Sequence, residues 1–130
     1  MKLVLDTHFL IWMANTPGEI SAAEQRAING ARSRHVSAAS LWELRIKWRL
    51  RDRKGRRKGT LDPAQALVFI DTNSIDLISL EATDSMFTLE PPIDHRDPFD
   101  EMLLVHAQRL GARLLTRDRL LRDHPLALSV

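Results

Sequence analysis

The chain has no cysteine and no tyrosine among its 130 residues. The missing cysteine excludes disulfides, zinc sites built on thiolates and a thiol nucleophile. It also fits a reducing compartment, so we expect a cytoplasmic location. The missing tyrosine excludes phenolic acid–base chemistry. No apolar run approaches the roughly 18 residues of a membrane span, and the N-terminus lacks the pattern of a cleaved signal peptide. We therefore expect no membrane association.

Several motifs of phosphate and nucleotide chemistry are absent as well. The five glycines form neither a dinucleotide-binding turn nor a phosphate loop ending in Gly-Lys-Ser/Thr. An aspartyl-phosphate enzyme typically has a second aspartate two residues after the first, where this chain has His8. A metal-independent ribonuclease would use two histidines as acid and base, but the five histidines follow no motif that we recognise. They are His8 and His95, which lie nearest the acids described below, and His35, His106 and His124.

Short apolar runs alternate with segments that have helical spacing or helix caps. Strands alternating with helices indicate a parallel sheet covered on both faces. We predict one α/β domain over residues 1–130, a three-layer sandwich with a central, mostly parallel sheet of four to five strands flanked by helices. Ser21 and Ser40 are the expected N-caps, and Gly111 is an expected C-cap. The predicted strands are 1–5, 35–37, 75–80, 114–116 and 127–130, and the predicted helices are 8–15, 22–31, 41–49, 63–72, 81–89 and 99–110.

Four carboxylates stand at the edges of apolar segments, where a fold has little structural use for them. Asp6 and Asp118 follow predicted strands, whereas Glu43 and Asp100 lie near the N-terminal parts of predicted helices. Both positions open onto the carboxyl edge of a parallel sheet, where such folds bind ligands. Taken singly, the three aspartates are more simply explained as helix caps, and Glu43 as a half-exposed side chain. Together they would repel one another unless a cation lay between them, and their hard oxygens suit Mg²⁺ or Mn²⁺. The set points to metal-dependent phosphate chemistry.

Positive charge is concentrated in one segment of the chain. Residues 45–58 contain nine Lys or Arg and one acid, while the remainder has ten basic and sixteen acidic residues, a net charge of −6. This asymmetry suits a polyanion held by the basic segment while an acidic, metal-loaded pocket acts on it. The alternative is a solvated helix face followed by an exposed loop. The nine residues are Arg45, Lys47, Arg49, Arg51, Arg53, Lys54, Arg56, Arg57 and Lys58.

The four acids lie within four short motifs. These are Leu5-Asp6-Thr7-His8, Ser37-Ala38-Ala39-Ser40-Leu41-Trp42-Glu43-Leu44, His95-Arg96-Asp97-Pro98-Phe99-Asp100 and Leu115-Thr116-Arg117-Asp118. In their order, their spacing and the total length, they resemble PIN-domain ribonucleases, and among these the VapC-type toxins that have the His-Arg-Asp-Pro-Phe-Asp stretch. The resemblance extends over essentially the whole chain and implies a single PIN-like domain.

The resemblance also implies what the site residues do. Asp6, Glu43, Asp100 and Asp118 would form a catalytic metal pocket, and Asp97 would bind metal directly, through water, or only orient the loop. The enzyme would be a Mg²⁺- or Mn²⁺-dependent endoribonuclease, and the nine basic residues would contact the RNA. Three hydroxyl side chains would surround the metals or the scissile phosphate, namely Thr7, Ser40 and Thr116.

The implied partners are those of a type II toxin–antitoxin pair: an RNA substrate, a cognate VapB-type antitoxin and a second copy of the chain in a homodimer. DNA would be contacted only indirectly, through the antitoxin. Two features depart from the family pattern. Glu101 stands where a basic residue commonly follows the Asp-Pro-Phe-Asp stretch, and residues 47–58 are unusually long and basic. The alternative function is a non-catalytic PIN-like module that binds RNA or protein and has no need of an intact acid set.

Overall fold

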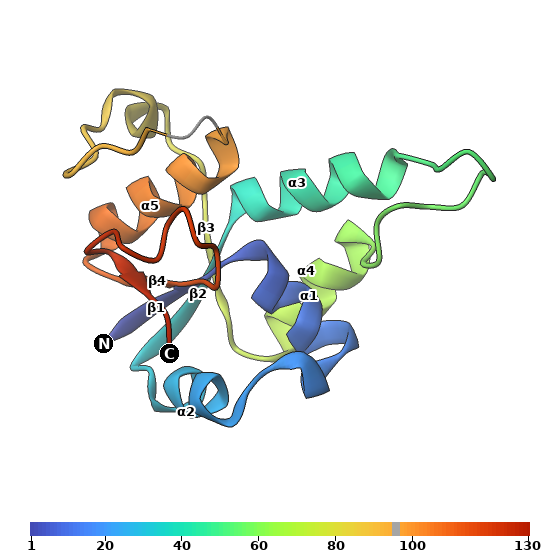
Figure 1. The fold of residues 1–130 in the computed structure, drawn as a ribbon, viewed down its shortest axis with the longest axis horizontal. Coiled ribbons are helices and arrows are strands. Elements are labelled where there is room, and N and C mark those ends of the chain that lie inside the picture. Colours follow the sequence, from blue (N-terminus) through green and yellow to red (C-terminus); the bar gives the residue numbers. More distant parts are fainter. Residues whose placement is uncertain (95–96) are drawn as a thin grey trace.

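The computed structural model describes residues 1–94 and 97–130, in which strands and helices alternate as predicted (Figure 1). None of the helices in these ranges combines the length and the apolar character needed to cross a membrane. The strands are β1 (Lys2–Leu5), β2 (Ser33–Ser37), β3 (Asp76–Ile78), β4 (Arg113–Leu115) and β5 (Ala127–Leu128). The α-helices are α1 (Thr7–Asn15), α2 (Ala22–Gly30), α3 (Ala38–Arg49), α4 (Pro63–Thr72) and α5 (Pro98–Leu110), and the 3-10 helices are η1 (Pro17–Glu19) and η2 (Ala82–Met86).

All five strands belong to one parallel sheet with the order β3-β2-β1-β4-β5. Val4 of β1 pairs with His35 of β2 on one side and with Leu114 of β4 on the other, so β1 is the central strand. The chain moves outwards from β1 to β2 and β3, and then returns through α5 to β4 on the opposite side of β1. The predicted α/β fold with a central sheet of four to five strands is confirmed.

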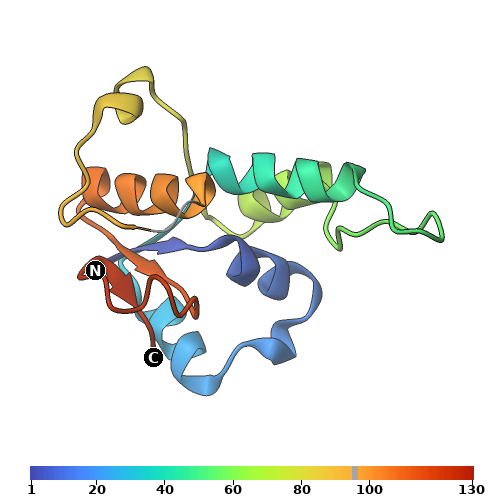
Figure 2. The ribbon, with the colours of Figure 1, turned by 45° about the horizontal axis from the view of Figure 1, so that its top comes forward.

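The central strand is buried on both faces from Leu3 to Leu5, which is why these three residues are all apolar. Leu3 and Leu5 belong to a core cluster that includes Ile28 of α2, whereas Val4 belongs to a second cluster with Leu104 of α5. This division follows from the alternation of side chains along a strand. Figure 2 shows α5 on one side of the sheet and α2 on the other, which gives the three predicted layers.

The helix ends agree with the sequence in two places and differ in one. Ser21 forms a capping box with Glu24 at the start of α2, and Gly111 ends α5 with a φ of 65°, a left-handed conformation that glycine adopts without strain. The predicted N-cap Ser40 is wrong. Ser37 caps α3 instead, and Ser40 is buried in the first turn. The reason is that β2 runs directly into α3, so the cap falls on the last residue of the strand.

One expected helix does not form as an α-helix, and the alternative interpretation of Asp118 as the cap of a last helix is wrong as well. Residues 81–89 contain only the short 3-10 helix η2, and residues 119–123 form turns, so Asp118 caps a turn rather than a final helix. The buried carboxylate of Asp84 anchors η2, since it lies 2.9 Å from His106 Nε2 and 2.9 Å from Arg109 Nε on α5. A tertiary hydrogen bond to His106 and an ion pair with Arg109 therefore hold this segment.

Residues 51–58, which we call the basic arm, project from the end of α3 (Figure 1). Contacts at the arm itself hold it: Asp52 pairs with Arg56 at 2.9 Å, and the guanidinium of Arg57 lies 4.4 Å from the ring centre of Trp48. At the base of the arm, Gly59 passes close to α3, where a Cβ atom would come within 2.8 Å of the backbone nitrogen of Trp48. A glycine is therefore required for the chain to turn back against the helix.

Candidate active site

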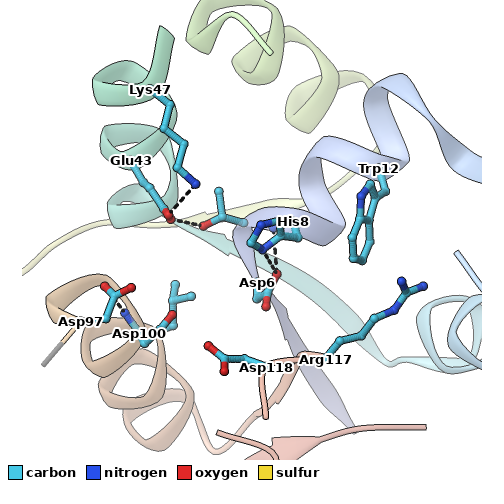
Figure 3. A pocket seen from close by; sticks show the side chains of 11 residues that line it. Asp6, His8, Trp12, Glu43, Lys47, Asp97, Asp100, Arg117 and Asp118 are labelled. Carbon is cyan, nitrogen blue, oxygen red and sulfur yellow. Dashed lines mark hydrogen bonds and ion pairs between the residues drawn. The ribbon is translucent and has the colours of Figure 1, made fainter. Parts of the chain in front are cut away.

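A cavity of about 410 Å³ opens beside the end of β1, and five carboxylates line it (Figure 3). They come from four places in the fold: the residue after β1, the middle of α3, the start of α5 and the loop after β4. The structure thus brings every acid of the predicted metal site to one cavity, while the roles of these acids remain a prediction. The five are Asp6, Glu43, Asp97, Asp100 and Asp118.

The strand order explains why distant acids meet here. The connections from β1 and from β4 run to opposite sides, and such a switch point leaves a crevice at the carboxyl ends of the strands. Leu5 and Leu115 are register partners in β1 and β4. The residues that follow them, Asp6 and Thr116, therefore lie side by side, and the hydroxyl of Thr116 donates a hydrogen bond to Asp6 Oδ2 at 2.8 Å.

Asp6 is 8% exposed, and its two oxygens have different partners. Oδ1 accepts hydrogen bonds from the backbone nitrogens of His8 and Phe9, at 2.8 and 3.4 Å, and so caps α1. Burial raises the pKa of Asp6, although the hydrogen bond from Thr116 and the proximity of His8 oppose that rise. The explanation of Asp6 as a helix cap is therefore correct, but it is incomplete because the same side chain lines the cavity.

Glu43 is held from two directions on α3. The hydroxyl of Thr7 donates to Glu43 Oε1 at 2.7 Å, and the ammonium of Lys47, one helical turn along, lies 3.2 Å from Oε2. Thr7 Oγ1 is also 2.9 Å from the hydroxyl of Ser40. Of the three predicted hydroxyl side chains, Thr7 lines the cavity, whereas Ser40 and Thr116 lie behind it and hold Thr7 and Asp6 in place.

The remaining acids surround the start of α5 and the end of β4. Asp97 is the N-cap of α5, and its Oδ1 accepts hydrogen bonds from the backbone nitrogens of Phe99 and Asp100. Burial, and then the negative charges of Asp97, Asp118 and Asp6, raise the pKa of Asp100 to about 7. The neighbouring carboxylates are thus close enough to disfavour the ionisation of Asp100 near neutral pH.

The donor set fits a hard divalent cation. Mg²⁺ and Mn²⁺ prefer carboxylate oxygens, and a cation among these acids would offset the repulsion that raises the pKa of Asp100. Across residues 1–94 and 97–130, no three His, Asp or Glu side chains stand close enough together to hold one ion in this conformation. The ligand chemistry is therefore present, whereas the ligand distances are not yet formed.

Sequence reasoning missed three cavity residues outside the acid set, namely Trp12, Leu103 and Arg117. Trp12 lies four residues after His8 on the same helix, so the two side chains share one face. This spacing could have predicted that Trp12 lies beside the acids. For Arg117 the sequence held no such signal. Its guanidinium makes two hydrogen bonds to Glu24 of α2, at 2.7 and 2.6 Å, and this pairing lowers the pKa of Glu24 to about 2.

The nine predicted RNA-binding cations do not gather at the cavity. Lys47 lines it, Arg45 and Arg49 lie on the exposed surface of α3, and the other six belong to the basic arm. His95, which the sequence placed near the acids, lies outside the described residues together with Arg96.

The fold is similar to that of several solved structures. A chain of VapBC2 from Rickettsia felis, bound to a DNA fragment from their promoter, aligns with a TM-score of 0.64 at 16% identity and covers 100% of this chain and 98% of that chain. A chain of the DNA-bound VapBC from Salmonella typhimurium gives 0.60 at 19% identity, with 100% and 97% covered. VapBC-1 from nontypeable Haemophilus influenzae gives 0.54 at 19% identity, with 91% and 87% covered.

Comparisons of the sequence with curated proteins and with family models give two further findings. No curated protein matches this chain significantly. The family model described as PIN domain, however, matches residues 3–125, which is nearly the whole chain and includes all five carboxylates of the cavity. The chain therefore belongs to the PIN-domain family.

Proposed function

We propose that this PIN-domain protein is the toxin of a type II toxin–antitoxin pair and acts as a Mg²⁺- or Mn²⁺-dependent endoribonuclease. The observation that carries the nuclease proposal is the meeting of five carboxylates from four chain segments in one cavity. Capping accounts for Asp6 and Asp97 singly. It does not account for Asp100, whose pKa is raised to about 7 by burial and by the other acids. Without a bound cation, the folded state is therefore less stable when Asp100 is ionised.

The cation would be held by Asp6, Asp100 and Asp118, with Asp97 and Glu43 as further oxygens on the cavity wall. When bound, it supplies Lewis-acid activation of water and neutralises charge that builds on the phosphoryl oxygens. The RNA phosphodiester would be hydrolysed to leave a 5′-phosphate and a 3′-hydroxyl.

Residues behind the cavity preorganise these ligands. The hydroxyl of Thr116 donates a hydrogen bond to Asp6 Oδ2, and the hydroxyl of Thr7 donates one to Glu43 Oε1. Thr7 Oγ1 is also within hydrogen-bond distance of the hydroxyl of Ser40. Such outer contacts orient carboxylate ligands and reduce the movement that binding requires. The ammonium of Lys47 adds a positive charge on the cavity wall, where it is available to the phosphate of the substrate.

The basic arm, together with Arg45 and Arg49, would contact the RNA backbone away from the cut site. Contacts with phosphates position a nucleic acid without reading its sequence, and they make binding sensitive to salt. All six basic residues of the arm are exposed, as such contacts require.

A VapB-type antitoxin is the proposed protein partner. The support is the likeness of the fold to chains of three VapBC structures, two of which contain DNA. We extend the proposal to a homodimer of this chain, and to DNA contacts made only through the antitoxin.

The test is cleavage of a mixed RNA panel by purified, antitoxin-free protein with Mg²⁺ or Mn²⁺, with EDTA, and with the variants Asp100→Asn and Asp118→Asn. These variants keep the side-chain size and avoid Asp6, which also caps α1. Asp71→Asn is the matched control, because Asp71 is an exposed carboxylate on α4 outside the cavity lining. We expect metal-dependent cleavage by the parent and the control, and its loss in EDTA and in both cavity variants.

Two results would contradict the proposal in different ways. Cleavage that survives EDTA would overturn the metal-dependent mechanism. Folded protein that binds RNA but cuts no member of the panel, and whose Tm does not rise with Mn²⁺, would favour the alternative of a non-catalytic binding module.

A further inference from the structure

One wall of the cavity is aromatic rather than acidic. His8 and Trp12 both line it, and they stand one turn apart on α1, directly after Asp6. Their ring centres are 5.8 Å apart and the rings are inclined by 36°. Figure 3 shows the two rings on the same side of the cavity, with Arg117 reaching towards Trp12 from below. We call His8, Trp12 and Arg117 the aromatic wall.

The aromatic wall is fixed in place from behind. The guanidinium of Arg117 lies 4.3 Å from the ring centre of Trp12, and Phe9 meets the same ring edge-on at 5.1 Å and 76°. The donors of Arg117 are engaged with both oxygens of Glu24, a residue only 3% exposed, and with the carbonyl of Glu19. Arg117 therefore serves as a support for the Trp12 ring, and its charge is already matched by a buried carboxylate.

The wall remains accessible in spite of this support. The side chain of His8 is 62% exposed and that of Arg117 is 42% exposed, while Trp12 is half-buried. Trp12 packs partly against the core, but both rings also line the cavity that the five carboxylates line. Flat aromatic surfaces beside a phosphodiester-binding site are suited to stack nucleobases, because every base has a π-face.

We propose that His8 and Trp12 form a subsite for the nucleobase of a nucleotide that adjoins the scissile phosphate. The inference rests on the proposed nuclease function and adds the two side chains that would contact a base beside the cut. A base can stack on a protein ring only if it is unstacked from its neighbours, as in loops, bulges and single strands. Stacking does not distinguish strongly among bases, so the subsite requires a base without selecting which one.

The test compares the binding of two probes: a pentauridylate RNA and a ribose-phosphate chain of the same length without bases. Affinity is measured by fluorescence anisotropy in Mn²⁺ in the Asp100→Asn background, where hydrolysis is not expected. Stacking of one base is worth about 1–3 kcal/mol, so the RNA should bind roughly 5- to 150-fold more tightly than the abasic chain. Trp12→Leu should reduce this ratio to nearly one, and His8→Ala should reduce it in part.

Trp42→Leu is the matched control, since Trp42 is 59% exposed on α3 and lies outside the cavity lining. It should leave the ratio unchanged. The subsite would be overturned if the ratio of the RNA affinity to the abasic affinity were near one in the Asp100→Asn protein. It would also be overturned if neither Trp12→Leu nor His8→Ala lowered that ratio. His8→Ala keeps the test valid if Trp12→Leu does not fold, because the His8 side chain is exposed. RNA cleavage by the parent is measured separately, so a protein that fails to cut but keeps the ratio would contradict the nuclease and not the subsite.

Discussion

The carboxylate-lined cavity and the basic arm are built in opposite ways. The cavity takes its five acids from four segments that are up to 112 positions apart in sequence, and strand register brings Asp6 beside Thr116. The arm is one continuous segment that projects from the body and is held by contacts such as Asp52 with Arg56 and Arg57 with Trp48 (Figure 1). The first depends on the whole fold, whereas the second depends mainly on its own residues and on the end of α3.

The buried acids of the cavity and the exposed cations of the arm differ in their cost to stability. Burial raises the pKa of both Asp6 and Asp100, and the charges of nearby acids raise that of Asp100 further, so the ionised forms of these two side chains are kept at a cost to stability. Exposed arginines and lysines on a projecting loop have almost no such cost, because solvent screens them. We therefore expect changes in the cavity to alter metal binding, stability and cleavage together, and changes in the arm to alter RNA affinity alone.

The largest expected effect comes from Asp100→Asn. It removes one of the proposed oxygen ligands and the carboxylate on which the charges of three other acids converge. Cleavage should fall by about a hundredfold or more, since outer contacts of a metal site alone are worth about 10- to 100-fold. The rise in Tm caused by Mn²⁺ should also disappear. Unchanged cleavage in Asp100→Asn, with Asp71→Asn as the reference, would show that the cavity is not the catalytic site.

A smaller effect is expected from the double change Arg53→Gln and Lys54→Gln at the tip of the basic arm. Each lost phosphate contact should reduce the slope of log K against log salt by about 0.7 for single-stranded RNA, or about 1.4 for two contacts. The stabilisation by Mn²⁺ should not change. Arg26→Gln with Arg32→Gln is the control, because both side chains are exposed on the body. An equal loss of slope in the control would mean that RNA binding is spread over the whole surface.

The cavity should also make the metal-free protein less stable as the pH rises. The pKa of Asp100 is about 7 in the folded chain, above the value near 4 of an unfolded aspartate, so the folded state binds more protons between these values. Stability is therefore lost from about pH 4 to pH 7. The loss should be a few degrees in Tm, on the order of 1 kcal/mol after discounting for solvent at a half-buried group.

Thermal melts at pH 5 and pH 8 measure this effect. Asp100→Asn should flatten the difference, and Mn²⁺ should reverse it, because the metal binds the ionised carboxylates. Glu24, with a pKa of about 2, acts in the opposite direction and contributes stability that is lost only as the pH falls from about 4 towards 2. Burial lowers the pKa of His35 and His106, so these two groups add stability as the pH rises over the same range. A pH dependence that is the same in the parent and in Asp100→Asn would therefore contradict the repulsion among the acids.

The sequence predicts some parts of the fold and of the cavity but not others. Apolar runs and helix caps were sufficient for the alternating elements, and acids placed after strands predicted a meeting at the carboxyl edge. Strand order was not readable, because it depends on α5 carrying the chain back across β1. The contact of Arg117 with Glu24 spans 93 positions and leaves no local pattern. The cap of α3 was misplaced for a similar reason, since only the direct passage of β2 into α3 selects Ser37 over Ser40.

Lys47 belongs to both regions and gives the smallest and most specific prediction. It is part of the basic segment in sequence, yet it lines the cavity and its ammonium lies 3.2 Å from Glu43 Oε2. There it would compete with the proposed divalent cation for the same carboxylate. Lys47→Met should therefore tighten Mn²⁺ binding by a few fold, in keeping with the modest strength of a partly exposed ion pair, and should weaken RNA binding at the same time. Lys47→Arg keeps the charge and serves as the control. It should leave the affinities for Mn²⁺ and for RNA unchanged. If Lys47→Met weakens both ligands together, Lys47 holds Glu43 in place for the metal, and the cation at this position supports the acidic site without competing with it.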